Sequence, residues 1–83
     1  MKLLYFASLR QKIGKPEEDV DVPDDVRDMA GLIDWLMTRG PEYEAAFENK
    51  AVIRAAIDQE HAKLDAALGH PREVAFFPPV TGG

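Results

Sequence analysis

Residues 28–40 read DMAGLIDWLMTRG, and this stretch predicts the main helix of the fold. Its apolar side chains recur at spacings of three, four, seven and eight residues, the period of one helical face, so we expect them in the core. They are Met29, Leu32, Ile33, Leu36 and Met37. Asp28 is the expected N-cap, Arg39 belongs in the last turn, and Gly40 is expected to end the helix. Trp35 falls beside the apolar stripe, so we expect it at the helix edge, covering the core or contacting a partner.

Two strands are expected before this helix. Residues 2–8, KLLYFAS, are rich in strand formers and too short for a typical helix. Alternation places Phe6 on the face opposite Leu3 and Tyr5. A turn at 14–16 then leads to EEDVDV at 17–22, where acidic and apolar residues alternate until a proline ends the run. The two segments suggest a hairpin whose inward residues on the second strand are Val20 and Val22.

The chain after the helix predicts one more short helix and three strands. Residues 41–48, PEYEAAFE, can form a second helix opened by its proline, and 51–57, AVIRAAI, read as a strand. Residues 58–61 suggest a turn into a brief fourth strand, 62–68 a helical turn, and 72–77, REVAFF, the last strand. A mixed sheet of four to five strands packed on one main helix buries these apolar faces economically. The layout predicts an α+β fold of the β-grasp type.

Composition limits the classes of function. At 83 residues the chain has room for one core and little volume for a deep pocket, which argues against a self-sufficient enzyme. The absence of cysteine excludes disulfides, thiolate metal sites and a cysteine nucleophile. Ten Lys and Arg against 15 Asp and Glu give a net charge of −5, which disfavours nucleic acid and favours a basic protein surface as partner. No run approaches the roughly 18 apolar residues of a membrane span, and the N-terminal apolar stretch is too short for a secretory signal, so a cytoplasmic protein is expected.

No motif for metal binding or catalysis stands out. His61 and His70 lack a spacing that would present two ligands on one helical face, so we expect them in solvent-exposed loops and predict no metal site. The acidic run at 17–28 lacks the alternating oxygen ligands, central glycine and closing glutamate of a calcium loop. No Ser/His/Asp arrangement or glycine-rich phosphate loop is present at a usable spacing.

The chain ends FFPPVTGG at 76–83, which divides it into a folded domain at 1–77 and an extended tail at 78–83. Pro78 and Pro79 lack backbone donors and favour an extended conformation, so they stop strand pairing. Six residues at about 3.3 to 3.6 Å each give a reach of about 20 Å. Two final glycines without Cβ atoms can pass through a narrow channel and leave a terminal carboxylate open to attack. The alternative is a frayed end or a cloning remnant.

The tail also carries a resemblance. EVAFFPPVTGG at 73–83 closely resembles the C-terminus of the molybdopterin synthase small-subunit family of ubiquitin-like sulfur carriers. LLYFASLRQKIG at 3–14 and the capped helix with its glycine resemble the same family, so the likeness spans nearly the whole chain. A Gly-Gly end alone also fits ubiquitin, the thiamine-pathway sulfur carrier and the ubiquitin-related modifier, whereas the preceding Phe-Phe-Pro-Pro-Val favours the molybdopterin family. The chain departs from the family in GHPR at 69–72, where members usually carry an acidic turn.

The resemblance implies a carrier cycle. An activating enzyme uses ATP to adenylate the carboxylate of Gly83, and sulfur transfer converts it to a thiocarboxylate. The tail then enters the large synthase subunit and gives its sulfur to cyclic pyranopterin monophosphate, two transfers building the dithiolene of molybdopterin. A heterotetramer of two large and two small subunits is implied, with no cofactor bound to the carrier. The tail residues implied in this insertion are Pro78, Pro79, Val80, Thr81 and Gly82.

The same resemblance assigns partner docking to Phe77, which alternation places opposite Val74 and Phe76, and to Phe6. For Phe6 the alternative of a two-sided core stays open. Two other functions also stay open. The chain could be a ubiquitin-like modifier whose Gly83 forms an isopeptide bond to a lysine, or a sulfur carrier for thiamine or another pathway.

Overall fold

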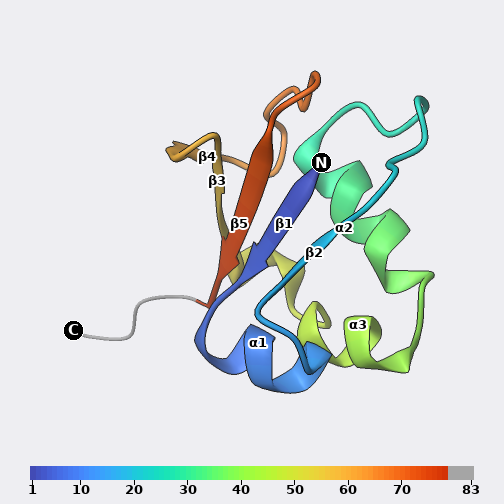
Figure 1. Ribbon diagram of the computed structural model, residues 1–83, viewed down its shortest axis with the longest axis vertical. Coiled ribbons are helices and arrows are strands. Elements are labelled where there is room, and N and C mark those ends of the chain that lie inside the picture. The colour runs from blue at the N-terminus through green and yellow to red at the C-terminus, as the bar shows by residue number, and fades with distance from the viewer. Residues whose placement is uncertain (79–83) are drawn as a thin grey trace.

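A five-stranded mixed sheet organises the molecule, and the computed structural model describes it over residues 1–78. Three α-helices and a 3₁₀-helix connect its strands within this range (Figure 1). In chain order the elements are β1 (Lys2–Tyr5), α1 (Ala7–Ile13), β2 (Glu17–Asp19), α2 (Met29–Met37), α3 (Pro41–Ala46), a 3₁₀-helix (Lys50–Val52), β3 (Arg54–Ile57), β4 (Glu60–Ala62) and β5 (Glu73–Phe77).

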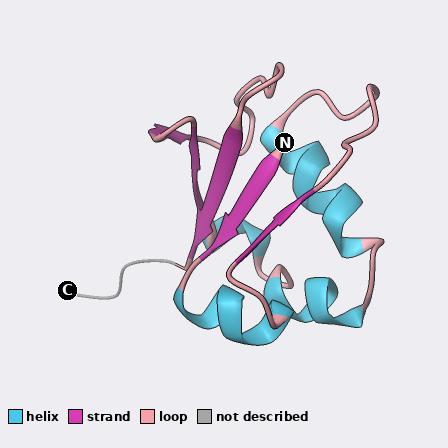
Figure 2. Ribbon diagram, viewed as in Figure 1, coloured by secondary structure: helices cyan, strands magenta, loops and turns pink. Residues whose placement is uncertain are grey.

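The strand order is β2-β1-β5-β3-β4 (Figure 2). The central strands β1 and β5 run parallel, with Leu3 opposite Val74 and Tyr5 opposite Phe76, and every other pair is antiparallel. A parallel pair formed by the first and last strands needs a long crossover, and the helices supply it. This is the ubiquitin-like β-grasp fold, so the predicted fold class is confirmed.

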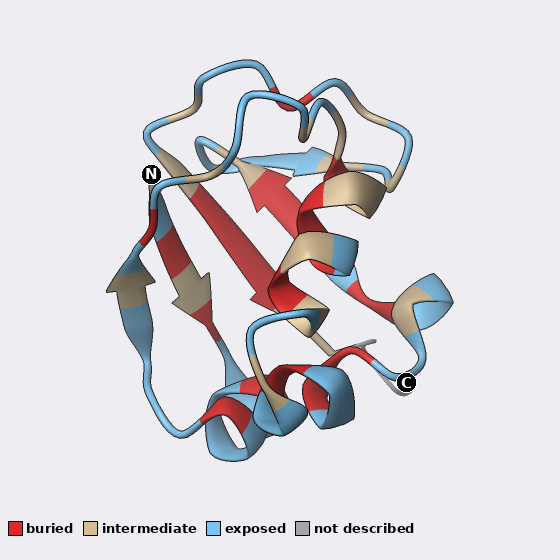
Figure 3. Cartoon of the chain, turned by 90° about the vertical axis from the view of Figure 1, so that its right-hand side faces the viewer, coloured by how far each residue is buried: buried red, intermediate tan, exposed pale blue. Residues whose placement is uncertain are grey.

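The core lies between the sheet and α2, which crosses one sheet face (Figure 3). The predicted stripe is confirmed, because its first four members have no exposed surface. They are Met29, Leu32, Ile33 and Leu36. Phe76 is the aromatic centre of the sheet side, with its ring centroid 6.2 Å from that of Tyr5 and 5.1 Å from that of Phe47. Each such buried side chain contributes roughly 1.5 to 3 kcal/mol, so β5 is anchored at the middle of the sheet.

The N-terminus of α2 shows why residues 62–68 are not helical. The Asp28 carboxylate accepts from the Gly31 amide at 2.7 Å, which confirms the predicted N-cap. Two further amides of the first turn, Met29 and Ala30, donate to the carbonyls of Ala66 and Leu64. The loop therefore satisfies donors that a helix start leaves free. The helical turn predicted for 62–68 is wrong because these carbonyls cap α2 from outside.

The strand predicted at 2–8 is also wrong beyond Tyr5, because the chain turns into α1 at Ala7. Ala7 has a φ of +51°, a left-handed conformation that turns the backbone away from the sheet. Only two residues of this short helix, Leu9 and Ile13, are buried, four positions apart. β1 and β2 are antiparallel neighbours as expected, but a helix rather than a tight turn joins them.

The ends of the other elements differ by a few residues from the predicted ones. α2 ends at Met37, so Arg39 lies beyond its last turn, and Gly40 is the N-cap of α3 rather than a helix terminator. The second helix is confirmed, with its proline in the first turn. The strand predicted at 51–57 starts only at Arg54 because the 3₁₀-helix precedes it. β2 ends at Asp19, earlier than the predicted 17–22, and beyond it Val20 is buried as expected whereas Val22 is half-buried. None of the helices in residues 1–78 is long and apolar enough to cross a membrane.

Candidate docking surface

An exposed aromatic pair lies at the end of the sheet where β5 finishes. The rings of Phe6 and Phe77 stack with centroids 5.2 Å apart and planes 27° apart. Phe6 is 44% exposed and Phe77 is half-buried, so both lie outside the buried core. The two-sided core weighed for Phe6 is therefore wrong. We call Phe6 and Phe77 the aromatic pair.

The backbone fixes the position of Phe6. Its amide donates to the carbonyl of Phe76 at 3.2 Å, which extends the β1–β5 ladder by one residue. The left-handed Ala7 follows immediately and starts α1. A non-glycine residue in this region stores strain of about 1 to 3 kcal/mol, which the surrounding structure must hold. The turn leaves Phe6 stacked on Phe77, the residue whose side chain points away from the core.

The face opposite α2 continues from the aromatic pair as a row of small and apolar residues. The register places Ala75 between Leu4 and Ala56 and places His61 beyond Ala56. Ala56 and Ala75 are almost fully covered by their neighbours. Small side chains in the centre with larger ones around them make a shallow surface that another protein could cover.

A hollow of 380 Å³ adjoins this face at the β3–β4 edge. Its lining residues are Ala51, Ile53, Arg54, Ala55, His61, Ala62, Lys63 and Leu64. Two of them also border the aromatic pair. Arg54 is the register partner of Phe77, and the His61 ring lies 6.4 Å from the Phe77 ring, tilted by 49°. The sequence interpretation gave no role to Arg54 or Lys63, although alternation along β3 could have placed Arg54 on this face.

The described chain ends one residue beyond β5. Pro78 follows Phe77 directly and is half-buried. The other predicted tail residues lie outside the described residues, so their roles stay predictions. They are Pro79, Val80, Thr81, Gly82 and Gly83.

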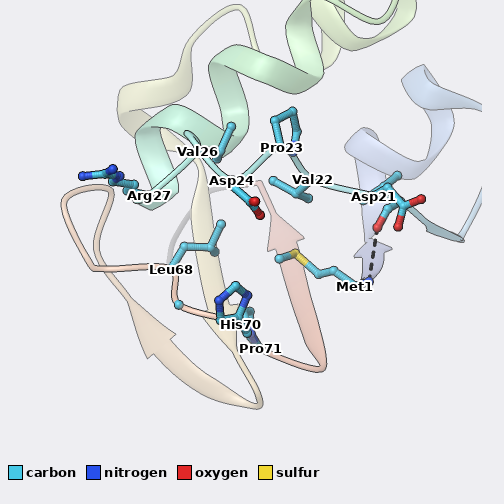
Figure 4. A pocket seen from close by; sticks show the side chains of 12 residues that line it. Met1, Asp21, Val22, Pro23, Asp24, Val26, Arg27, Leu68, His70 and Pro71 are labelled. Atoms are coloured by element: carbon cyan, nitrogen blue, oxygen red, sulfur yellow. Dashed lines mark hydrogen bonds between the residues drawn. The ribbon is translucent and has the colours of Figure 1, made fainter.

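The two histidines lie apart. His61 is on β4 rather than in a loop and His70 is in the loop before β5, and both are exposed. Among residues 1–78 no group of three His, Cys, Asp or Glu side chains is placed to hold a metal. His70 belongs to a cavity of 480 Å³ between the 20–27 and 68–71 segments (Figure 4). That cavity adjoins Met1, at the opposite end of β1 from Phe6.

A polar cluster around Glu18 ties β2 to the rest of the molecule. Oε2 of its carboxylate accepts from the hydroxyl of Tyr5 at 2.7 Å and from that of Tyr43 at 2.6 Å. Oε1 lies 3.1 Å from Arg39 and 3.5 Å from Lys15. The side chain of Glu18 is 10% exposed. Such a well-paired inward carboxylate points to a structural role.

The environment of this cluster shifts the pKa values of Glu18 and of the two tyrosines in opposite directions. Burial raises the pKa of Glu18, but hydrogen bonds from Tyr43, Tyr5 and Arg39 and the charge of Arg39 outweigh burial, so the pKa lies below its ordinary 4.5. Burial first, and then the adjacent carboxylate, raise the pKa of both tyrosines.

The guanidinium of Arg39 also lies 5.4 Å from the ring centre of Trp35, which packs partly buried against the core. Trp35 therefore covers the core at the helix edge.

Comparison with known proteins places this geometry in context. A family model described as the ThiS family matches residues 3–83. Proteins named molybdopterin synthase sulfur carrier subunit are similar over the full chain: 34% identity in Haemophilus influenzae and 32% in Escherichia coli, each covering 100% of this chain and 99% of the relative.

Solved structures with the same fold point to two kinds of protein. A candidate molybdopterin converting factor subunit 1 from Pyrococcus furiosus matches with a TM-score of 0.73 and 27% identity, covering 95% of each chain. Small archaeal modifier protein 1 of Haloferax volcanii matches with a TM-score of 0.72 and 27% identity, covering 96% of this chain and 97% of its own.

Proposed function

This chain belongs to the ThiS family, and from that premise we propose that it is the sulfur carrier subunit of a molybdopterin synthase. The observation that carries the proposal is the full-length similarity to several proteins of that name. The aromatic pair supports it, because an exposed apolar surface lies directly before the segment predicted to deliver the sulfur. The cytoplasmic location expected from the sequence stays a prediction.

The proposed chemistry resides in the terminal carboxylate. A carboxylate has no good leaving group, so an activating enzyme joins Gly83 to the α-phosphate of ATP and releases pyrophosphate. A sulfur nucleophile then displaces AMP, and the product is a thiocarboxylate. This chain contributes the carried group and the surface by which partners hold it, while the active sites belong to those partners.

Docking and delivery are separate tasks in this proposal. The aromatic pair fixes the carrier on the large subunit, and a tail with a reach of about 20 Å brings Gly83 to cyclic pyranopterin monophosphate. Two such deliveries complete the dithiolene, which suits the predicted heterotetramer of two large and two small subunits.

A second candidate function is a ubiquitin-like modifier. The likeness to small archaeal modifier protein 1 favours it, because that fold match covers nearly the whole of both chains. In this alternative the same activated Gly83 is attacked by a lysine amine rather than by sulfur. The two functions share activation and differ in the nucleophile, so the product distinguishes them.

The test is the intact mass of the protein after incubation with its activating enzyme, ATP and a sulfur donor. We expect a mass gain that matches the replacement of one oxygen by sulfur, and the variant lacking Gly83 should show none. The sulfurated protein should then convert the pterin precursor to molybdopterin when the large subunit from the same genome is added. Conjugates to lysine that survive reduction, without any sulfur gain, would instead establish the modifier.

A further inference from the structure

We propose that the hollow at the β3–β4 edge is a cationic socket that receives an acidic side chain of the partner protein docked on the aromatic pair. We define the cationic socket by Arg54, His61 and Lys63. The inference rests on the proposed function, since it adds a specificity contact to the same docking event. It names the chemistry of the partner surface, which is a glutamate or aspartate beside an apolar patch.

The hollow is lined by basic and apolar residues. Its polar lining residues are those of the cationic socket, and none of the residues that line it is acidic. This is unexpected in a chain with 15 acidic and 10 basic residues and a net charge of −5. The described ion pairs of the molecule involve Lys2, Lys15, Arg39 and Lys50, and among residues 1–78 no carboxylate lies within ion-pair distance of Arg54 or Lys63.

The cationic socket lies next to the aromatic pair. Arg54 lies opposite Phe77 in the β3–β5 register, and residues so paired have side chains on the same sheet face. His61 lies between the hollow and the aromatic pair, because it lines the first and has its ring 6.4 Å from Phe77. A protein that covers the aromatic pair therefore also reaches the cationic socket, where β3 and β4 form the edge of the sheet (Figure 1).

The mixture of groups favours a protein side chain over a small free anion. The remaining lining residues are apolar, and two of them, Ala55 and Ala62, are register partners on the core side of the sheet, so the hollow borders both faces at this edge. A small, strongly hydrated anion gains little stabilisation from apolar surroundings. The methylene groups of a glutamate, and the apolar rim around it, can pack against them. Arg54 offers a planar fork of donors that matches a carboxylate, and Lys63 adds a point charge.

The test measures association of this chain with the large subunit from the same genome at low and high salt. The double variant Arg54→Glu with Lys63→Glu should raise Kd at least about tenfold at low salt, and the difference should shrink as salt screens the charges. The matched control is Arg27→Glu with Arg72→Glu, which makes the same charge change at the far end of the sheet. This control should shift Kd less than about threefold.

A zero-length carbodiimide reagent supplies the direct readout, because it joins a lysine amine to a carboxylate only when the two touch. We expect a cross-link from Lys63 to an aspartate or glutamate of the large subunit, found by mass spectrometry of the digested complex. Lys63→Arg keeps the charge, so it should keep the affinity and lose this cross-link.

The outcomes separate the two proposals. Equal binding by both double variants, or a large subunit cross-linked only through other lysines, would overturn the socket while leaving the sulfur carrier intact. Binding of phosphate or sulfate by the free chain at the socket, with partner association unaffected by the Glu variants, would also overturn it. No association of the unaltered chain with the large subunit would overturn the proposed function and the socket with it.

Discussion

A change at one side chain of the aromatic pair should affect docking more than folding. Phe6 is 44% exposed and lies outside the core, so its truncation leaves the packing of the core intact. We expect Phe6→Ala to cost less than about 1 kcal/mol of unfolding free energy. The same change should weaken binding to the large subunit by at least 1 kcal/mol, since a central aromatic is a typical hot spot.

Denaturant unfolding and calorimetric titration check these two numbers on the same samples. The control is Val26→Ala, which removes apolar surface beside the cavity at the other end of the sheet and should leave binding unchanged. A Phe6→Ala variant that binds as well as the parent chain would show that the aromatic pair is not the docking surface.

Glu18 shows the opposite case, an inward residue whose role is stability. Tyr5 is 1% exposed, so its hydroxyl has no water to replace a lost partner. We expect Glu18→Gln to destabilise the protein by about 1 to 3 kcal/mol at pH 7, because a neutral amide cannot replace a carboxylate that accepts from two hydroxyls and pairs with two cations.

The pH dependence of this residue follows from its lowered pKa. Because the pKa is lower in the folded chain than its ordinary 4.5, the stability from Glu18 is complete above 4.5 and is lost as the pH falls through the folded value. The parent chain and Glu18→Gln should therefore approach each other in stability as the pH falls below 4.5. Parallel unfolding curves across this range would argue that Glu18 contributes by packing alone.

At the scale of elements, the start of α2 is stabilised by a local contact and by a distant one. The Asp28 carboxylate accepts from Gly31, while the 63–68 loop supplies two carbonyls. We expect Asp28→Ala to cost about 1 kcal/mol, the usual value of a lost N-cap. Asp28→Asn keeps an acceptor oxygen and should recover most of this loss in thermal unfolding. Equal losses for Ala and Asn would show that charge near the helix dipole matters more than the hydrogen bond.

The β3–β4 hairpin offers a stabilising change. Its two loop residues, Asp58 and Gln59, both have positive φ, at 48° and 73°. Two-residue hairpin loops of this kind favour glycine at the second position. We expect Gln59→Gly to stabilise the chain by about 0.5 to 1 kcal/mol, since relief of the left-handed strain exceeds the added flexibility of the unfolded chain. Gln59→Ala keeps the strain and should be nearly neutral, and a glycine variant no more stable than the alanine variant would contradict this reasoning.

The sequence predicts well those elements that their own periodicity defines. The stripe of α2 and the alternation of β5 needed only local spacing, and both are confirmed. Helix α1 could not be seen, because two buried residues four apart give a weak signal and the preceding apolar run continues a strand pattern. The 63–68 loop could not be predicted either, since its conformation is set by capping a helix more than 30 positions earlier in the chain.

The candidate site likewise combines features set by local sequence with features set by distant parts of the chain. Roles for the tail and for Phe77 could be predicted from the sequence because the terminal motif is contiguous. The exposure of Phe6 depends on the sharp turn at Ala7, which no propensity predicts. The cationic socket depends on the folded sheet, which brings Arg54 beside Phe77 and brings Arg54 and Lys63 to one hollow.

Charge is distributed unevenly over the whole molecule. Seven of its 15 acidic residues fall within 17–28, the segment that forms the β2 edge and the approach to α2, and one basic residue accompanies them. The cationic socket lies at the β4 edge, which is the opposite edge of the five-stranded sheet from β2. A charge distribution of this kind orients a molecule as it approaches a partner, which sets association rate and specificity more than affinity.

Docking and sulfur delivery belong to different parts of the chain, so a shortened chain should dock without delivering sulfur. Every core residue that the structure describes lies within 1–77, so we expect a chain ending at Pro78 to fold with a melting temperature close to that of the full protein. It retains the aromatic pair and the cationic socket and lacks Gly83. We therefore expect it to bind the large subunit more weakly than the full chain, to compete with it, and to accept no sulfur. Competition is measured as inhibition of molybdopterin formation by increasing amounts of the shortened chain, with its Phe6→Ala form as control. A shortened chain that folds but does not compete would mean that the tail supplies nearly all the affinity, and the sheet surface would then serve only to orient it.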